Sequence, residues 1–406
     1  MQAPPLPDAA PARSHALLMA NLVAQLAFGL LAMTICLPSM QDWPTVFGAT
    51  QAAVQLTFSG FVAAYGGMQL VYGPLSDRFG RKPVLLCGLV IACAGSLLAA
   101  LAPDLATLTL GRVLQGAGSA AGMVTARAMV QDLFEGAERT RVMAFIGMSM
   151  GVCPPLATLL GGHLHVRVGW QSSFMVMTVF ALVLMVAAWW GLPARRPQAA
   201  PASGGLRSLT ASYARLAREP AFLLHVLLLS SATATFYSFL AGTPLVLRAY
   251  GVGPDRIGWY IGVIPIAYIF GNLATTRMAH HRSDRFIMGW GQALILVGLA
   301  LVLLLGWAGW RSPLALALPL MLLGVGHGLL VPPTLTGTVG LIPALAGSAA
   351  AVAGLSQQLL GALGGFVVGM VPHETQVNLG ALMLMWTLLG VAAQLLLHRG
   401  GRGRAP

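Results

Sequence analysis

The chain has few charged residues. Of its 406 residues only 8% are charged and 57% are hydrophobic, and the mean hydropathy is +0.78. Soluble domains contain about 25% charged residues, so a soluble core does not account for this balance. The apolar residues fall into runs of about 20, each long enough to cross a hydrocarbon layer as a helix. The composition therefore predicts an all-α polytopic membrane protein whose surroundings are a lipid bilayer.

Lysine is almost absent. Lys82 is the one lysine among the 23 basic residues, and it follows Arg81. A P-loop requires a Gly directly before its Lys, so we expect no nucleotide partner. The net charge of +12 would suit a nucleic acid, but the arginines are scattered between apolar runs. Loop orientation in a membrane explains them better, and we expect no nucleic-acid partner.

Residue clusters for metal binding or catalysis are also missing. The four cysteines show no CxxC spacing and have no His nearby, so we interpret them as small hydrophobic side chains. The predicted spans contain no HExxH, Ser/His or paired-Asp arrangement. We therefore expect no cofactor, no metal site and no enzyme activity.

Twelve apolar runs predict twelve transmembrane helices. The longest polar connection, rich in Pro, Ala, Gly and Arg, separates six runs from six, which is typical of an internal repeat. The predicted spans are 17–38, 50–72, 83–102, 105–130, 140–163, 170–192, 220–247, 257–279, 285–308, 313–336, 343–371 and 376–397. The predicted parts are a tail (1–16), an N-terminal half (17–192), a linker (193–219), a C-terminal half (220–397) and a second tail (398–406).

The distribution of basic residues predicts the orientation. With the N-terminus in the cytoplasm, 17 Arg and Lys residues fall in inside loops and tails, and four fall in outside loops. Because loops that stay in the cytoplasm carry the excess of Arg and Lys, we expect both tails and the linker to be cytoplasmic.

The connection between the second and third predicted spans contains a recognisable pattern, from Gly73 to Pro83. It resembles the signature loop of the major facilitator superfamily, GxLaDrxGrkxxl, in order and spacing. We expect close helix approach at the first Gly, a tight turn at the second, and a charged latch that closes one face of a transporter. The alternative is an ordinary cytoplasmic loop. The candidate gating residues are Gly73, Asp77, Arg78, Gly80, Arg81 and Lys82.

The fourth predicted span carries an arginine near the membrane interior, where a charge is expensive and usually functional. The run from 110 to 134 resembles the arginine motif of drug:H⁺ antiporters, and its end resembles the bicyclomycin/chloramphenicol resistance branch. The alternatives are a backbone-capping arginine at 112 and a membrane-edge arginine at 127. The candidate residues are Arg112, Gln115, Gly116, Arg127 and Asp132.

The fifth predicted span resembles the Gly- and Pro-rich antiporter motif. The resemblance implies a kinked helix that packs the two halves together. Thr158 stands where the family usually has a second Pro. The candidate residues are Gly151, Pro154, Gly161 and Gly162.

The first predicted span departs from the branch pattern, because Thr34 replaces the usual acidic residue. Every Asp and Glu falls in a loop or at a span end. Proton exchange requires a titratable group inside the membrane, and His titrates in the physiological range. The candidate proton carriers are His327, His225 and Asp132; the alternatives are neutral buried histidines and, for Asp132, a salt bridge to Arg139 or Arg141. We expect His163, His165, His280 and His281 to be solvated.

Polar and aromatic residues inside apolar spans are candidates for a cargo cavity. Each can alternatively form a helix–helix hydrogen bond. The candidates are Asn21, Gln25, Thr34, Tyr65, Gln69, Tyr237 and Gln357.

The resemblance implies a multi-pass exporter of the bacterial inner membrane. Its cargo would be a small, amphipathic, drug-like molecule, moved outward by alternating access in exchange for protons. The alternative is a facilitator that exports a metabolite, sugar-like molecule or siderophore without protons, which the missing membrane acid favours.

Overall fold

The computed structural model describes residues 12–193, 206–342 and 345–400. Over these ranges the chain is helical and contains no strand. The N-terminal half contributes six long helices. They are α1 (Ala12–Thr34), α3 (Gln51–Phe79), α4 (Arg81–Ala100), α5 (Leu105–Leu133), α6 (Gly136–Val168) and α7 (Gln171–Gly191).

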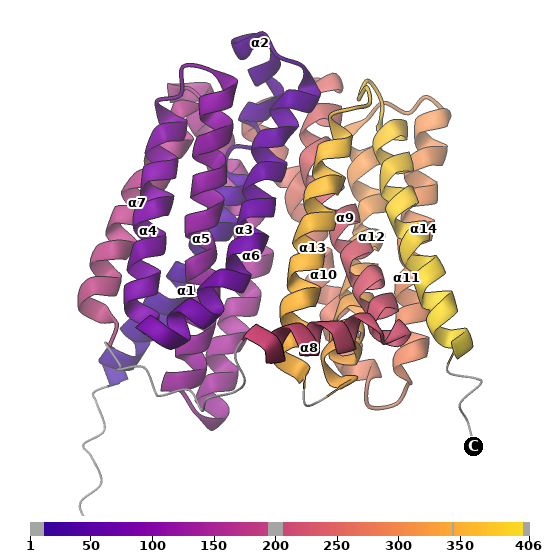
Figure 1. Cartoon of the computed structure of the whole chain (residues 1–406). Coiled ribbons are helices and arrows are strands. Elements are labelled where there is room, and N and C mark those ends of the chain that lie inside the picture. The colour runs from indigo at the N-terminus through magenta and orange to yellow at the C-terminus, as the bar shows by residue number, and fades with distance from the viewer. Residues whose placement is uncertain (1–11, 194–205, 343–344, 401–406) are drawn as a thin grey trace, which may run out of the picture.

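The C-terminal half also contributes six long helices, which lie beside those of the N-terminal half (Figure 1). They are α9 (Pro220–Ala249), α10 (Pro254–Met278), α11 (Asp284–Trp307), α12 (Pro313–Gly340), α13 (Ala346–Val368) and α14 (Gln376–Gly400).

Three short helices complete the described part of the chain. The 3₁₀ helix η1 (Ser39–Gln41) and α2 (Trp43–Phe47) connect α1 to α3 at one end of the bundle. Helix α8 (Leu206–Ala217) precedes α9 and lies at the opposite end, together with the start of α1 and the end of α14 (Figure 1). We call these ends the α2 end and the α8 end. None of the three short helices was expected from the sequence. Most of each predicted tail and residues 194–205 of the predicted linker lie outside the described residues, and α8 forms most of the rest of the linker.

Ten of the long helices are apolar enough to cross a membrane by length and composition. The other two, α3 and α5, do not meet that criterion. They pack against each other, and α3 also packs against α13 of the other half. A helix enclosed by other helices needs less apolar surface than one that faces lipid, so its composition is a weaker signal.

Several helix ends differ from the predicted span boundaries, notably around Gly80 and in α6. Helix α3 continues to Phe79 and α4 starts at Arg81, so the expected gating loop is helical on both sides of Gly80. Gly80 is the single residue between the two helices, and its φ is 97°. Glycine adopts this angle easily because it has no Cβ, whereas other residues do not. Helix α6 extends from Gly136 to Val168, beyond both ends of the predicted span.

The two halves touch along two antiparallel helix pairs, α3 with α13 and α6 with α10. The α6–α10 pair separates progressively toward the α8 end. A methyl group at Gly258, Gly262 and Gly151 would lie 2.5, 3.1 and 3.6 Å from the nearest atom of the facing helix, and at Gly147 it would meet nothing within 4 Å. The glycines thus permit backbone contact near the α2 end only.

The α3–α13 pair separates in the same direction. A methyl group at Gly369 would lie 2.7 Å from Ala52, and one at Gly66 would overlap the Gln358 side chain. Toward the α8 end, Gly73 and Gly354 continue the facing stripes of the two helices, yet a methyl group at either would meet nothing within 4 Å. The halves are therefore closed together at the α2 end and parted at the α8 end.

Candidate functional site

Arg112 of α5 is completely buried and forms hydrogen bonds with backbone carbonyls at the end of α1. Its Nη1 donates to the Ala32 carbonyl at 2.7 Å and its Nη2 to the Met33 carbonyl at 3.4 Å. The guanidinium also donates to the Gln115 side-chain oxygen and lies 4.3 Å from the centre of the Phe61 ring. The last carbonyls of a helix lack intrahelical partners and carry partial negative charge. Arg112 therefore adopts the backbone-capping arrangement, the alternative considered from the sequence.

Gln115 and Gly116 extend this cluster. The Gln115 amide donates to the Ser96 hydroxyl of α4 at 2.8 Å. A side chain at Gly116 would overlap the Phe61 carbonyl, so α5 and α3 are in backbone contact there. Thr34 is fully buried, and its hydroxyl donates to the Leu30 carbonyl. The residue that replaces the family's acid therefore packs in the protein and does not face a cavity in this conformation.

The signature residues around Gly80 form a charged cluster within the N-terminal half. Arg81 pairs with Asp77 and donates to the Ser76 hydroxyl at 2.7 Å, and its Nε lies 3.3 Å from an Asp132 carboxylate oxygen of α5. Arg81 is thus one partner of Asp132 that the sequence did not suggest; the sequence suggested Arg139 or Arg141. The ion pairs are partly exposed, so each contributes little by itself.

Three other signature residues have different roles from those expected. Lys82 donates to the Trp189 and Leu192 carbonyls at 2.6 and 2.8 Å, so it caps the end of α7. Gly73 makes no close helix contact, because the halves are parted at this end. Arg78 is exposed and lies over the Phe79 ring. The contacts described for this cluster stay within one half and do not latch the two halves together.

Gly161 and Gly162 of α6 touch two different partners. A side chain at Gly161 would overlap the Ile35 carbonyl that follows α1, and one at Gly162 would overlap the Pro254 carbonyl at the start of α10. Pro154 lies inside the helix, and its carbonyl accepts from the Thr158 hydroxyl at 2.8 Å. The motif thus brings α6 against its own half and against the other half.

Asn21 and Gln25 contact α7. The Asn21 amide donates to the Ala187 carbonyl at 2.7 Å, and the Gln25 amide donates to the Leu184 carbonyl at 2.9 Å. These contacts match the helix–helix alternative. The two residues therefore do not belong to the opening between the halves in this conformation.

A belt of aromatic and amide side chains lies where the two halves begin to part. The Tyr237 hydroxyl of α9 donates to the Gln358 side-chain oxygen of α13 at 2.9 Å, and the Tyr237 ring meets Phe58 of α3 edge to face. Gln357 accepts from Thr233 of α9 at 3.2 Å. The sequence singled out Gln357 but missed its neighbour Gln358, because only the helix register shows that Gln358 faces α3.

Tyr65 and Gln69 continue the belt along α3 toward the open end. Tyr65 is 4% exposed, and its hydroxyl has no hydrogen-bond partner among the described residues. Gln69 lies one turn further and is half-buried. A buried hydroxyl without a hydrogen-bond partner costs free energy, so the Tyr65 hydroxyl is suited to form a hydrogen bond with a bound molecule.

Arg127, one of the α5 candidates, is exposed.

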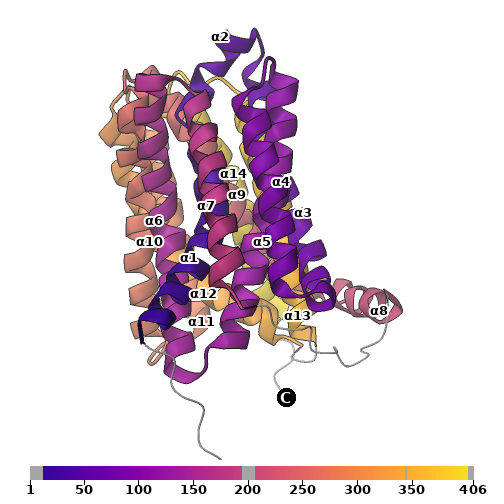
Figure 2. The ribbon, with the colours of Figure 1, turned by 90° about the vertical axis from the view of Figure 1, so that its left-hand side faces the viewer.

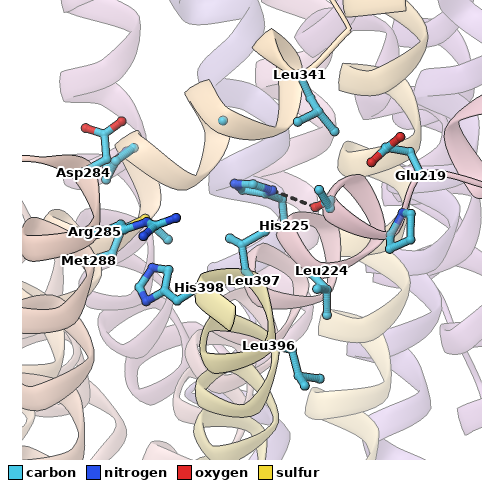
Figure 3. A pocket seen from close by; sticks show the side chains of 14 residues that line it. Glu219, Leu224, His225, Asp284, Arg285, Met288, Leu341, Leu396, Leu397 and His398 are labelled. Atoms are coloured by element: carbon cyan, nitrogen blue, oxygen red, sulfur yellow. Dashed lines mark hydrogen bonds between the residues drawn. The ribbon is translucent and has the colours of Figure 1, made fainter. Parts of the chain in front are cut away.

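The two histidine candidates have unlike surroundings. His327 is 5% exposed within α12, and no described side chain forms a hydrogen bond or ion pair with it. His225 is half-buried at the α8 end of α9, and its ring bonds to the Ala221 carbonyl (Figure 3). His225 lines a cavity of about 510 Å³ inside the C-terminal half, together with Glu219, Asp284, Arg285 and His398 (Figure 3). This cavity is separate from the opening between the halves.

The α2 end carries an ionic cluster that the sequence did not predict. Arg248, at the end of α9, lies 3.0 Å from one Asp42 carboxylate oxygen, and His165 of α6 lies 2.9 Å from the other. Arg248 also donates to the Gln41 carbonyl. The expectation that His165 is solvated is therefore wrong, because folding brings Asp42 to it across 123 residues.

Two helical halves that close at one end and part at the other are the arrangement of a polytopic membrane transporter. The Major Facilitator Superfamily model matches residues 17–365, and the chain belongs to this family. Within it, the relatives identify the drug:H⁺ antiporter branch named for bicyclomycin and chloramphenicol resistance. The chain is 30% identical to the multidrug resistance protein D of Escherichia coli over 92% of this chain and 93% of that one.

Other relatives and solved structures agree. The chain is 27% identical to the chloramphenicol resistance protein of Pseudomonas aeruginosa, over 85% of this chain and 82% of that one. Its fold matches a bacterial homologue of the human lysosomal transporter Spinster, solved in an inward-facing conformation, with a TM-score of 0.77. That match covers 97% of this chain and 98% of the other at 16% identity, and it shows the fold alone.

Proposed function

We propose that the protein is a twelve-span exporter of the bacterial inner membrane that moves small amphipathic compounds outward by alternating access. Its α8 end faces the cytoplasm. The distribution of basic residues supports this orientation, because Arg277, Arg282, Arg285 and Arg399 join the signature cluster at the α8 end. The conformation described above is then the inward-facing one, open to cargo from the cytoplasm.

The cargo surface is the belt formed by Tyr65, Gln69, Tyr237, Gln357 and Gln358. The observation that carries this proposal is that these residues lie where both helix pairs begin to separate, between contacts at the α2 end and open space at the α8 end. Rings with amide and hydroxyl groups suit an amphipathic molecule, which needs apolar contact and a few hydrogen bonds. The names of the relatives, multidrug resistance protein D and chloramphenicol resistance protein, support the cargo class.

Protons are the proposed coupling ion, and His327 is the proposed carrier. It is the candidate that is buried inside a long helix, away from both ends of the bundle, and it has no hydrogen-bond or ion-pair partner among the described residues. Asp132 already pairs with Arg81, and His225 lies at the cytoplasmic end of α9. A carrier must exchange its proton with each side in turn, which suits a residue in the interior of the bundle.

Export without protons is the second candidate. Two observations favour it. The acids within the described ranges lie in loops, at helix caps or in terminal turns, and Thr34, where the resemblance implies an acid, is buried and donates to the Leu30 carbonyl. A conventional carboxylate carrier in the membrane is therefore missing from the described part of the chain.

Inside-out vesicles distinguish the two candidates. The vesicles are energised to an acid interior, chloramphenicol is added as the first probe, and a pH-sensitive dye reports the gradient. Proton exchange predicts that the compound dissipates the gradient, and that His327→Gln abolishes this signal while His163→Gln, a change at an exposed histidine, leaves it unchanged.

Uptake of labelled compound gives the complementary result. Uptake without a dye signal, insensitive to a protonophore, would reject proton exchange and support the uncoupled exporter. A Tyr65→Phe variant tests the cargo surface: we expect weaker uptake, about five-fold at equal cargo concentration, because one hydrogen bond is lost. Uptake equal to that of the parent protein would remove Tyr65 from the cargo surface.

A further inference from the structure

Helix α8 lies outside the two bundles. It runs across the α8 end, at a steep angle to the long helices (Figure 1), and extends sideways beyond them (Figure 2). With 12 residues it is about 18 Å long. Its position is the level at which the long helices end, which is where a membrane surface meets water.

The sequence of α8 divides into an apolar stripe and a basic one. Leucine and tyrosine recur at intervals of three and four residues, which places them on one side of the helix. Arginines fall on the opposite side, where Arg215 and Arg218 are exposed. The apolar stripe ends with Tyr213 and Leu216, and the basic stripe ends with Arg215 and, just after the helix, Arg218.

The apolar stripe connects α8 to the helices that open and close. Leu216 is 1% exposed and packs in a cluster with Phe222 and Val226 of α9 and with Ala349 and Ala353 of α13. These residues belong to the cytoplasmic ends of the two helices. Helix α13 faces α3 across the opening. A displacement of α8 is therefore transmitted to one wall of the opening.

We propose that α8 binds the headgroups of anionic phospholipids in the cytoplasmic leaflet through Arg215 and Arg218, and so fixes the inner ends of α9 and α13 at the membrane surface. The proposal rests on the orientation given under Proposed function. Charge complementarity supports this partner, because α8 contains no Asp or Glu, and Arg215 of the helix and Arg218 just after it lie opposite the apolar stripe. Amphipathic basic helices lie in the headgroup region, and each basic residue strengthens binding to an anionic surface about five-fold.

The test measures the depth of α8 in the membrane. A spin label is placed at Tyr213→Cys in the full chain, with the four native cysteines replaced. The protein is reconstituted into phosphatidylcholine vesicles with or without phosphatidylglycerol. Collision with oxygen and with a water-soluble nickel complex reports whether the label contacts lipid or water. We expect lipid contact that increases several-fold with phosphatidylglycerol, and that Arg215→Gln/Arg218→Gln abolishes the increase.

Arg277→Gln/Arg282→Gln is the matched control, since it removes the same charge from the same end without touching α8. We expect it to retain the lipid-dependent increase. The proposal would be overturned if the label lay at the same depth in both lipid mixtures, or if it contacted water in both. It would also be overturned if the control variant lost the lipid-dependent increase as fully as Arg215→Gln/Arg218→Gln does. The depth measurement needs neither cargo nor protons. The orientation is tested separately in vesicles in which all copies of the protein face the same way. If the nickel complex reaches the label only from the side opposite to the one proposed to be cytoplasmic, the proposed orientation is wrong. That result is distinct from a failure of lipid binding.

Discussion

Arg248 of the C-terminal half and Asp42 of the N-terminal half form an ion pair of 3.0 Å across the closed end of the protein. Both side chains are partly exposed, so the pair contributes at most about 1 kcal/mol. A transporter that alternates between two conformations of similar free energy is sensitive to a term of this size, since 1.4 kcal/mol changes a population ratio ten-fold. The pair is therefore suited to bias the equilibrium toward the conformation closed at the α2 end, which is the inward-facing one in the proposed orientation.

Arg248→Gln should shift the population toward the outward-facing conformation by about two- to five-fold. Distances between spin labels at Val46 and Trp310, both exposed near this end, would report the shift as a growing longer-distance population. Arg256→Gln is the control, because Arg256 is more exposed and pairs only loosely, at 3.9 Å, with the adjacent Asp255. An unchanged distance distribution in Arg248→Gln would show that the ion pair does not bias the equilibrium.

Gly162→Ala should prevent full closure at the α2 end. The added methyl group would overlap the Pro254 carbonyl of α10, so the α6–α10 pair must separate there. We expect strongly reduced transport and the same change in the label distances as above. Gly289→Ala is the control, because a methyl group at Gly289 meets nothing within 4 Å. Normal transport by Gly162→Ala would mean that the backbone contact is dispensable.

Arg112→Lys should fail to replace the native residue. The planar guanidinium reaches two carbonyls and the Gln115 side chain together, whereas an ammonium group has no such fork. Loss of buried hydrogen bonds should cost about 2 kcal/mol and lower the thermal midpoint in detergent by a few degrees. Arg167→Lys, at an exposed arginine of α6, should leave the midpoint unchanged. A parent-like midpoint in Arg112→Lys would reject the capping role.

His373 should make stability depend on pH. It lies in the connection between α13 and α14, and burial lowers its pKa from 6.5 to about 4, while a hydrogen bond with the Val371 backbone acts in the opposite direction. The folded protein keeps this ring neutral, whereas the unfolded chain takes up a proton below about pH 6.5. The contribution is therefore complete above about pH 6.5 and declines as the pH falls toward 4.

His373→Gln, which cannot titrate, should reduce the loss of thermal stability between about pH 7.5 and pH 5 by up to about 2 kcal/mol. His163→Gln provides the comparison at an exposed histidine. If the two variants and the parent protein lose the same stability over this interval, His373 is not the group responsible.

The helices were predictable because their signal is local. Long apolar runs identify helices such as α7 and α11 whatever lies beside them, since lipid demands apolar side chains at every turn. The signal weakens where helices cover one another, as in α3 and α5, and it fails at Gly73–Phe79, where polar residues continue a helix that the sequence ends too early. Helix α8 was not predicted because its apolar residues are few and lie within a stretch whose overall composition is polar.

The sequence by itself determined the class of protein, the family motifs and the basic residues that indicate orientation, because composition and spacing need no knowledge of contacts. Tertiary structure alone decided which partners those residues have. Arg81 contacts Asp132 from 51 residues away, and Tyr237 contacts Gln358 from 121 residues away. Which glycines touch the other half also depends on the packing of distant helices, and this packing changes with the conformation. Physical contact over such separations is fixed by helix packing and not by local propensity.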